Sequence, residues 1–157
     1  YLREEEVTLL IAGRPQIPLE PLLDLSKELD VSDKIIWYPH FIDEKYVSEF
    51  FQHAHVIILP HRNIDQSGVL ATAVYYEKPI IASRIGGFLE VIEDNKHGFL
   101  FENGNSEDLS VKISSFIHQN KFEIFSKEMR NLKNSWKSWD EISLDHLAVY
   151  TQSLGKN

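Results

Sequence analysis

The sequence has no cysteine, which excludes disulfide bonds and thiolate metal sites and fits a reducing compartment. It also has no apolar run that approaches the roughly 20 residues of a membrane-spanning helix. Its first residues do not have the pattern of a signal peptide. We therefore expect a cytoplasmic protein without a transmembrane segment, at most peripheral to a membrane in its full length.

Positive charge is scarce as well. There are 16 Lys and Arg against 24 Asp and Glu, which gives a net charge of −8 at pH 7. Broad binding of nucleic acid or of anionic membranes needs a basic surface, so we expect neither. An anionic ligand must instead be held locally, by backbone amides and a few cations. The dinucleotide fingerprint GxGxxG is absent after the first apolar run, "VTLLIAG" (7–13), which argues against a dehydrogenase.

The length of 157 residues suits one domain, 1–157. Apolar residues make up 43% and charged residues 25%, as in globular proteins. The first residue is Tyr1 rather than Met, and "YLREEE" has the character of a helix end. We therefore expect that the chain is a fragment whose preceding part is absent.

Short apolar runs alternate with segments of helical spacing along most of the chain. The runs predict buried strands at 7–13, 34–39, 55–60, 79–83 and 98–102. Helices are predicted at 18–30, 43–54, 67–77, 87–94 and 105–120, with two C-terminal helices in 121–154 that break near Asn134-Ser135. Their candidate N-caps include Asp43, Ser67 and Ser106. The alternation predicts a Rossmann-like, doubly wound parallel sheet with helices on both faces.

Two pairs of residues, Ser67-Gly68 and Gly86-Gly87, each follow a predicted strand and open a predicted helix. Ligands of open α/β sheets bind beyond the carboxyl ends of the strands, and helix N-termini there offer unpaired amides to a phosphate. His61 and Arg62 lie in the same loop as the first pair and can add charge-assisted bonds. Purely structural roles stay open for each residue taken singly: an N-cap, a tight turn, or a surface side chain.

The order "P-x(6)-SG…KPIIAS-x-IGG-x-x-E-x-I-x-D…G-x-L-x-E-x-x-N" resembles the C-terminal half of retaining GT-B glycosyltransferases, family 4 in particular. The resemblance runs from about Leu9 to Tyr150. It implies a nucleotide-sugar donor site on this domain and an acceptor-binding domain before it. It also implies transfer of a sugar to a glycan, lipid or small molecule, usually without a bound metal or other cofactor.

Matched onto the family's motifs, the resemblance implies that Asp65 and Glu90 are the catalytic residues, with Glu90 near the donor. Together with the loop residues described above, the candidate donor-binding set is Pro39, His40, Phe41, His61, Arg62, Ser67, Gly68, Val69, Thr72, Gly86 and Gly87.

The sequence departs from the family at several positions. The family's two usual glutamates fall on Ile64 and Thr72; Asp65 can replace the first after a slip of one residue. Glu77 stands where the family usually has glycine. The basic pair that usually neutralises the diphosphate lies upstream in the family, so we expect that this chain lacks it. Two alternatives therefore stay open: a GT-B epimerase or phosphorylase relative, and a non-catalytic nucleotide-binding α/β module.

Overall fold

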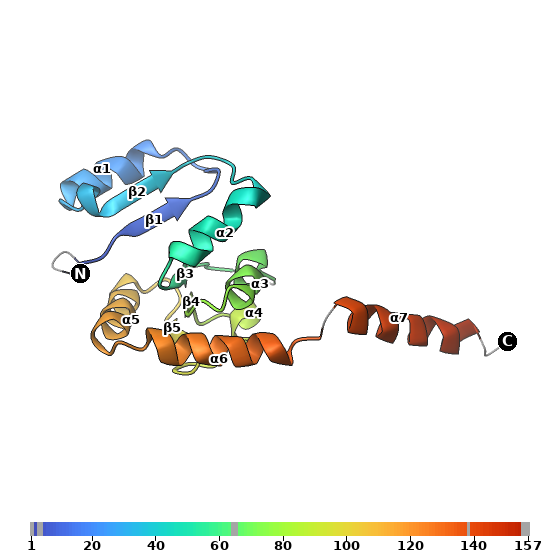
Figure 1. Ribbon diagram of the computed structural model, residues 1–157. Coiled ribbons are helices and arrows are strands. Elements are labelled where there is room, and N and C mark those ends of the chain that lie inside the picture. Colours follow the sequence, from blue (N-terminus) through green and yellow to red (C-terminus); the bar gives the residue numbers. More distant parts are fainter. Residues whose placement is uncertain (1, 3–4, 64–65, 138, 155–157) are drawn as a thin grey trace.

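A computed structural model gives an α/β fold in which strands and helices alternate from the N-terminal end to α5 (Figure 1). It describes the chain except residues 1, 3–4, 64–65, 138 and 155–157. In chain order the elements are β1 (Leu9–Ala12), α1 (Glu20–Glu28), the 3-10 turn η1 (Ser32–Lys34), β2 (Ile35–Tyr38), α2 (Glu44–His53), β3 (Ile57–Leu59), α3 (Gly68–Tyr75), β4 (Ile80–Ser83), α4 (Gly86–Leu89), β5 (Gly98–Phe101), α5 (Ser106–His118), α6 (Phe122–Ser135) and α7 (Trp139–Leu154).

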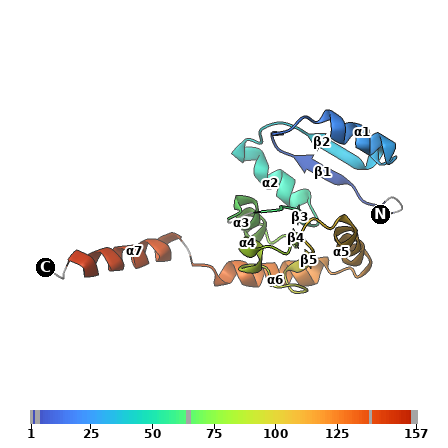
Figure 2. The ribbon, with the colours of Figure 1, turned by 180° about the vertical axis from the view of Figure 1, so that it is seen from behind.

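The strands form two parallel sheets. β1 pairs with β2 in one, and β4 lies between β3 and β5 in the other. Both views show α1 beside the β1–β2 sheet and α2 between that sheet and the elements from β3 to α6 (Figures 1 and 2). The predicted α/β class with parallel strands and crossover helices is confirmed. The single sheet that we expected from the sequence is divided in two.

The hydrophobic core surrounds the sheet β3–β4–β5, and every residue of β4 and β5 is buried. Because side chains alternate along a strand, β4 contributes to both faces. On one face α3, α4 and α6 pack against the sheet in a cluster of Leu59, Leu70, Ala73, Val74, Ile80, Ala82, Phe88, Ile92, Leu100 and Met129. On the other face α5 and the start of α6 form a cluster of Ile81, Phe99, Phe101, Phe116 and Phe125. This packing gives the strand ends of β3, β4 and β5 a rigid base.

β1 differs from the buried strand that its sequence predicted. Its residues Leu9, Leu10 and Ile11 are 41%, 42% and 39% exposed, although they are as apolar as those of β4. The prediction of burial was wrong here because it depends on neighbours, and each strand of a two-stranded sheet is an edge strand.

Glu5, just before β1, connects the two sheets through α5. Its carboxylate Oε1 accepts a hydrogen bond from Ser114 Oγ at 2.8 Å and lies 2.9 Å from His118 Nε2. Its backbone carbonyl accepts a bond from Lys34 Nζ at 2.7 Å. The hydrogen bond from Ser114, with the nearby charges, lowers the pKa of the Glu5 carboxyl below its usual value. Glu5 thus anchors the start of β1 to the helix that covers β4 and β5.

The helix ends confirm some of the predicted caps and correct others. Asp43 is the N-cap of α2 and accepts a bond from the amide of Lys45, as predicted. The N-cap of α5 is Asn105, whose Oδ1 accepts from the amides of Glu107 and Asp108, so the prediction of Ser106 was wrong by one residue. α4 is only four residues long, shorter than the predicted 87–94.

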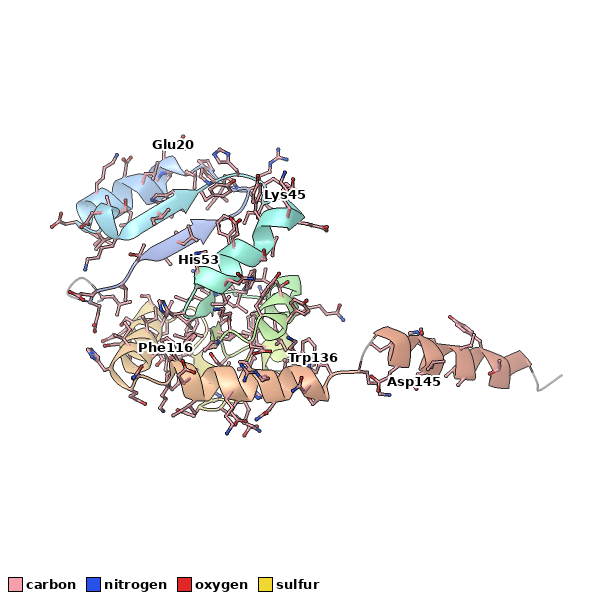
Figure 3. All side chains as sticks on the ribbon, in the orientation of Figure 1. Glu20, Lys45, His53, Phe116, Trp136 and Asp145 are labelled. Atoms are coloured by element: carbon pink, nitrogen blue, oxygen red, sulfur yellow. The ribbon has the colours of Figure 1, made fainter. Side chains whose placement is uncertain are left out.

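The two C-terminal helices break where the sequence predicted, since α6 ends at Ser135. Trp136 follows at its C-cap (Figure 3), and α7 then extends away from the other elements (Figures 1 and 2). The apolar side chains of Leu144, Leu147 and Tyr150 on α7 are 60% to 65% exposed. None of the described helices combines the length and the apolar character needed to cross a bilayer.

Candidate functional site

A cavity of about 490 Å³ lies beyond the carboxyl ends of β3, β4 and β5. Its walls come from three segments: the loop after β3, the start of α4 and the turn after β5. The lining residues are Arg62, Asn63, Ile85, Gly86, Gly87, Glu90 and Asn103. The structure therefore brings together four residues that the sequence predicted for the donor site: Arg62, Gly86, Gly87 and Glu90. The size is within the usual range for small-ligand sites.

Polar side chains from neighbouring segments hold the loop after β3. Ser83, at the end of β4, is 1% exposed, and its hydroxyl donates to the carbonyls of His61 and Leu59. Asn103 Nδ2 donates to the carbonyl of Arg62 at 2.9 Å. Two successive carbonyls of the loop are thus bound from two different strand ends. The backbone at the mouth of the cavity is therefore held by side-chain hydrogen bonds, although it lies outside the helices and strands.

The His61 side chain is packed rather than solvent-facing. Its ring contacts Phe88 edge-on, with 5.5 Å between the ring centroids. Its Nδ1 atom is buried, and none of the described residues offers it a hydrogen-bond partner. A buried polar atom without a partner is costly. His61, which the sequence predicted for the donor site, packs against α4 and is not among the residues that line the cavity.

Two arginines border this end of the sheet, and they differ in their pairing. Arg84 Nη2 forms a 2.8 Å salt bridge with Asp94, whose other carboxylate oxygen accepts a bond from the amide of Leu100. That guanidinium is therefore engaged in holding β4, α4 and β5 together. Arg62 lines the cavity itself and is the better placed of the two for an anion.

The N-terminus of α3 is capped and open. Ser67 Oγ accepts a bond from the amide of Leu70 at 3.1 Å, which confirms the capping role. The amides of Gly68 and Val69 come before the first intrahelical bond, which the amide of Ala71 makes to the carbonyl of Ser67. A Cβ added at Gly68 would meet no atom within 4 Å, and the same is true of Gly86. A ligand atom can therefore approach the backbone closely at both glycines.

Thr72 belongs to a different hollow from that of Glu90. This second hollow, of about 450 Å³, lies between α2 and α3 and is lined by Glu44, Val47, Ala71, Thr72, Tyr75 and Tyr76. The Thr72 hydroxyl donates to the carbonyl of Gly68 at 2.8 Å, so its proton is used inside the helix. Its oxygen can still accept a bond from a ligand.

The remaining predicted residues lie elsewhere. Pro39, His40 and Phe41 follow β2, in the other sheet, and line neither hollow. Phe41 is 77% exposed, and the ring of His40 contacts Tyr38 edge-on. Asp65, like Ile64, lies outside the described residues.

Sequence reasoning missed Asn63 and Asn103, which both line the cavity. Asn103 comes shortly after the fifth strand, so the rule that placed the other residues at the carboxyl ends of parallel strands applies to it too. The position of Asn103 after a predicted strand is therefore a signal that the sequence itself contains.

Comparison with known proteins gives one family match over most of the chain. The family described as glycosyl transferases group 1 matches residues 2–138. An uncharacterized glycosyltransferase of Methanocaldococcus jannaschii is 26% identical over 106 residues, 68% of this chain and 30% of that protein. A solved glycosyltransferase from Rickettsia africae has a TM-score of 0.83 at 20% identity, and the match covers 99% of this chain and 42% of that protein. Anabaena HepE, solved in complex with UDP, has a TM-score of 0.76 at 15% identity, and the match covers 95% of this chain and 41% of HepE. The chain thus spans less than half the length of each of these proteins.

Proposed function

The chain belongs to the glycosyl transferases group 1 family, and on that premise we propose that it binds the nucleotide-sugar donor of a retaining glycosyltransferase. The observation that carries the proposal is the cavity at the strand ends, where Arg62, Glu90 and the open backbone of Gly86 meet. A donor of this kind has a diphosphate that needs cations and amides, and a sugar whose hydroxyls need acceptors. The cavity offers both kinds of group.

In this proposal the diphosphate lies between Arg62 and the N-terminus of α3. The guanidinium donates charge-assisted hydrogen bonds, and the amides of Gly68 and Val69 add the partial positive charge of a helix end. These groups stabilise the negative charge that develops on the diphosphate as it leaves. Hydrogen-bond donors that are already in place where charge develops lower the reaction barrier strongly. The expected absence of a bound metal stays a prediction.

The sugar is then placed against Glu90, whose carboxylate can accept hydrogen bonds from two hydroxyls. Asp65, predicted as a further catalytic residue, belongs to the same loop as Arg62 by sequence. The nucleoside half is proposed to lie toward Thr72 and the hollow between α2 and α3. The segment Pro39 to Phe41 remains the predicted contact for the base.

Chemical-shift mapping of backbone amides with UDP, GDP and ADP tests the donor site. The largest shifts are expected in residues 60–69 and 84–90, with Asn103 included because it lines the same cavity. Arg62→Ala should weaken binding of whichever nucleotide binds best, by about tenfold, because a charged hydrogen bond is lost. Lys27→Ala on α1, whose lysine pairs with Asp24, is the matched control and should change nothing. Shifts confined to β1 and α1 would overturn the proposal.

We further propose that transfer needs an acceptor-binding domain that this chain does not supply. Support comes from the share of the relatives' length that it spans, 30% to 42%. Holding two substrates in place contributes about 7–11 kcal/mol to barrier reduction, and half of a cleft cannot provide it. The test is donor turnover by this chain beside the longer protein. Comparable transfer by both would place the active site wholly within these residues. The nature of the acceptor and a cytoplasmic location stay predictions.

A further inference from the structure

Asn103 projects from a turn that is fixed on both sides. The amide of Glu102 donates to Asp108 Oδ2 at 2.7 Å, and Asn105 caps α5 while its own side-chain amide donates to Glu102 Oε2. Gly104 completes the turn with a φ of +78°, a left-handed conformation that suits glycine. The side chain of Asn103 therefore starts from a rigid point at the rim of the cavity.

From this turn Asn103 reaches a residue 41 positions earlier. Its Nδ2 donates to the carbonyl of Arg62 at 2.9 Å, next to the carbonyl of His61 that Ser83 holds. Peptide units are planar, so a bond to the carbonyl of Arg62 fixes the orientation of the whole unit that joins it to Asn63. The backbone from which the guanidinium extends is thus set by Asn103.

We propose that Asn103 is a positioning residue that aims the Arg62 guanidinium at the diphosphate of the ligand. The inference rests on the proposed function, because it needs an anion in the cavity. Asn103 itself need not touch the phosphates. Its effect passes through Arg62, and this distinguishes it from a direct contact.

The proposal makes a selective prediction for ligands with and without phosphate. Asn103→Ala removes the bond to the carbonyl of Arg62 and leaves the loop attached by Ser83. The Kd for a nucleoside diphosphate should rise about fivefold, as expected for one neutral hydrogen bond. The matching nucleoside has no phosphate, so any affinity that it has should not change. A purely structural loss would weaken both ligands together.

The experiment is a double-mutant cycle on the 157-residue chain, with UDP, GDP or ADP, whichever binds the unaltered chain best. Asn103→Ala, Arg62→Ala and the double variant are titrated by amide shifts, with the matching nucleoside as the second ligand. In the Arg62→Ala background, Asn103→Ala should have no further effect, because it acts through that arginine. Asn131→Ala on α6 makes the same chemical change away from the cavity and should bind like the unaltered chain. Asn103→Asp is a second variant of similar size that cannot donate this bond, and it should bind more weakly than Asn103→Ala.

The outcomes separate the inference from the function on which it rests. If none of the three nucleotides shifts the cavity amides of the unaltered chain, the proposed function fails and the inference fails with it. If a nucleotide binds but Asn103→Ala leaves its Kd unchanged, the inference alone is overturned. It is also overturned if the losses of the two single variants simply add, because Asn103 then acts independently of Arg62.

Discussion

Glu77 occupies a position that the family usually gives to glycine, and its backbone shows the reason for that preference. Its φ is +58°, in the left-handed region, at the residue after the C-cap of α3. The amide of Glu77 donates to the carbonyl of Val74, and the amide of Lys78 to that of Ala73. This is the Schellman arrangement, in which glycine avoids the strain that a side chain brings. A glutamate here needs a compensating contact.

The compensation comes from α6. The Glu77 carboxylate accepts bonds from Arg130 Nε at 2.8 Å and Lys133 Nζ at 3.2 Å, while its own side chain is 25% exposed. Because the two cations are more exposed, we assign about 0.5 kcal/mol to each pair. The left-handed backbone costs about 1 kcal/mol with any side chain but glycine. Glu77→Ala should therefore lower the free energy of unfolding by about 1 kcal/mol, whereas Glu77→Gly should lie within about 0.5 kcal/mol of the unaltered chain.

Urea unfolding at neutral pH and low salt measures both differences, with Glu28→Ala on α1 as the control for removing a surface carboxylate. The hydrogen bond from Arg130, followed by the bond from Lys133, lowers the pKa of the Glu77 carboxyl in the folded chain. Its contribution is thus present above the ordinary carboxyl pKa and is lost as the pH falls through the folded value. The difference in the free energy of unfolding between Glu77→Ala and the unaltered chain should therefore become smaller at acidic pH. A glycine variant less stable than the alanine variant would refute the compensating role of α6.

Gly98, Glu5 and Glu90 each give a further prediction. Gly98 has a φ of +144°, and a Cβ there would lie 1.8 Å from the carbonyl oxygen of Ile80. Gly98→Ala should therefore lower the free energy of unfolding, measured in urea, by about 3 kcal/mol. A loss no larger than the roughly 0.5 kcal/mol typical of surface substitutions would contradict this prediction. Glu5→Ala removes the link from β1 to α5, so amide hydrogen exchange should quicken in β1 and stay unchanged in β4; equal changes in both strands would contradict the linking role. Glu90→Gln should weaken use of the sugar nucleotide in the longer protein more than binding of the free nucleotide, and equal losses would favour a purely structural role.

Prediction from the sequence was most accurate where the residues of one segment alone determine its structure. The strand "PIIAS" is apolar almost throughout, and it became the buried centre of a parallel sheet with its neighbours on both sides. Asp43 and Ser67 combine a short polar side chain with a following helical pattern, and both became N-caps. In these cases the information lies within a few residues, which sequence patterns capture.

Prediction failed where contacts between residues far apart in the chain determine the structure. β1 is as apolar as β4, but its exposure depends on which strands pair beside it. Thr72 and Glu90 were both predicted as site residues, yet they line separate hollows. The role of Asn103 depends on a bond across 41 positions, which no local pattern contains.

The charge of the chain shows why loop patterns, and not a basic surface, mark its candidate anion site. At physiological ionic strength the screening length is about 8 Å, so carboxylates elsewhere on a chain of net charge −8 act weakly at the cavity. The potential that an anion meets in the cavity is therefore set by the nearest cations, and of these Arg84 is already paired with Asp94. Arg62 then provides most of the charge that a diphosphate can meet there, and its direction depends on the carbonyl that Asn103 holds. Residue types along one loop therefore reveal the chemistry of the site, whereas a distant turn sets its geometry.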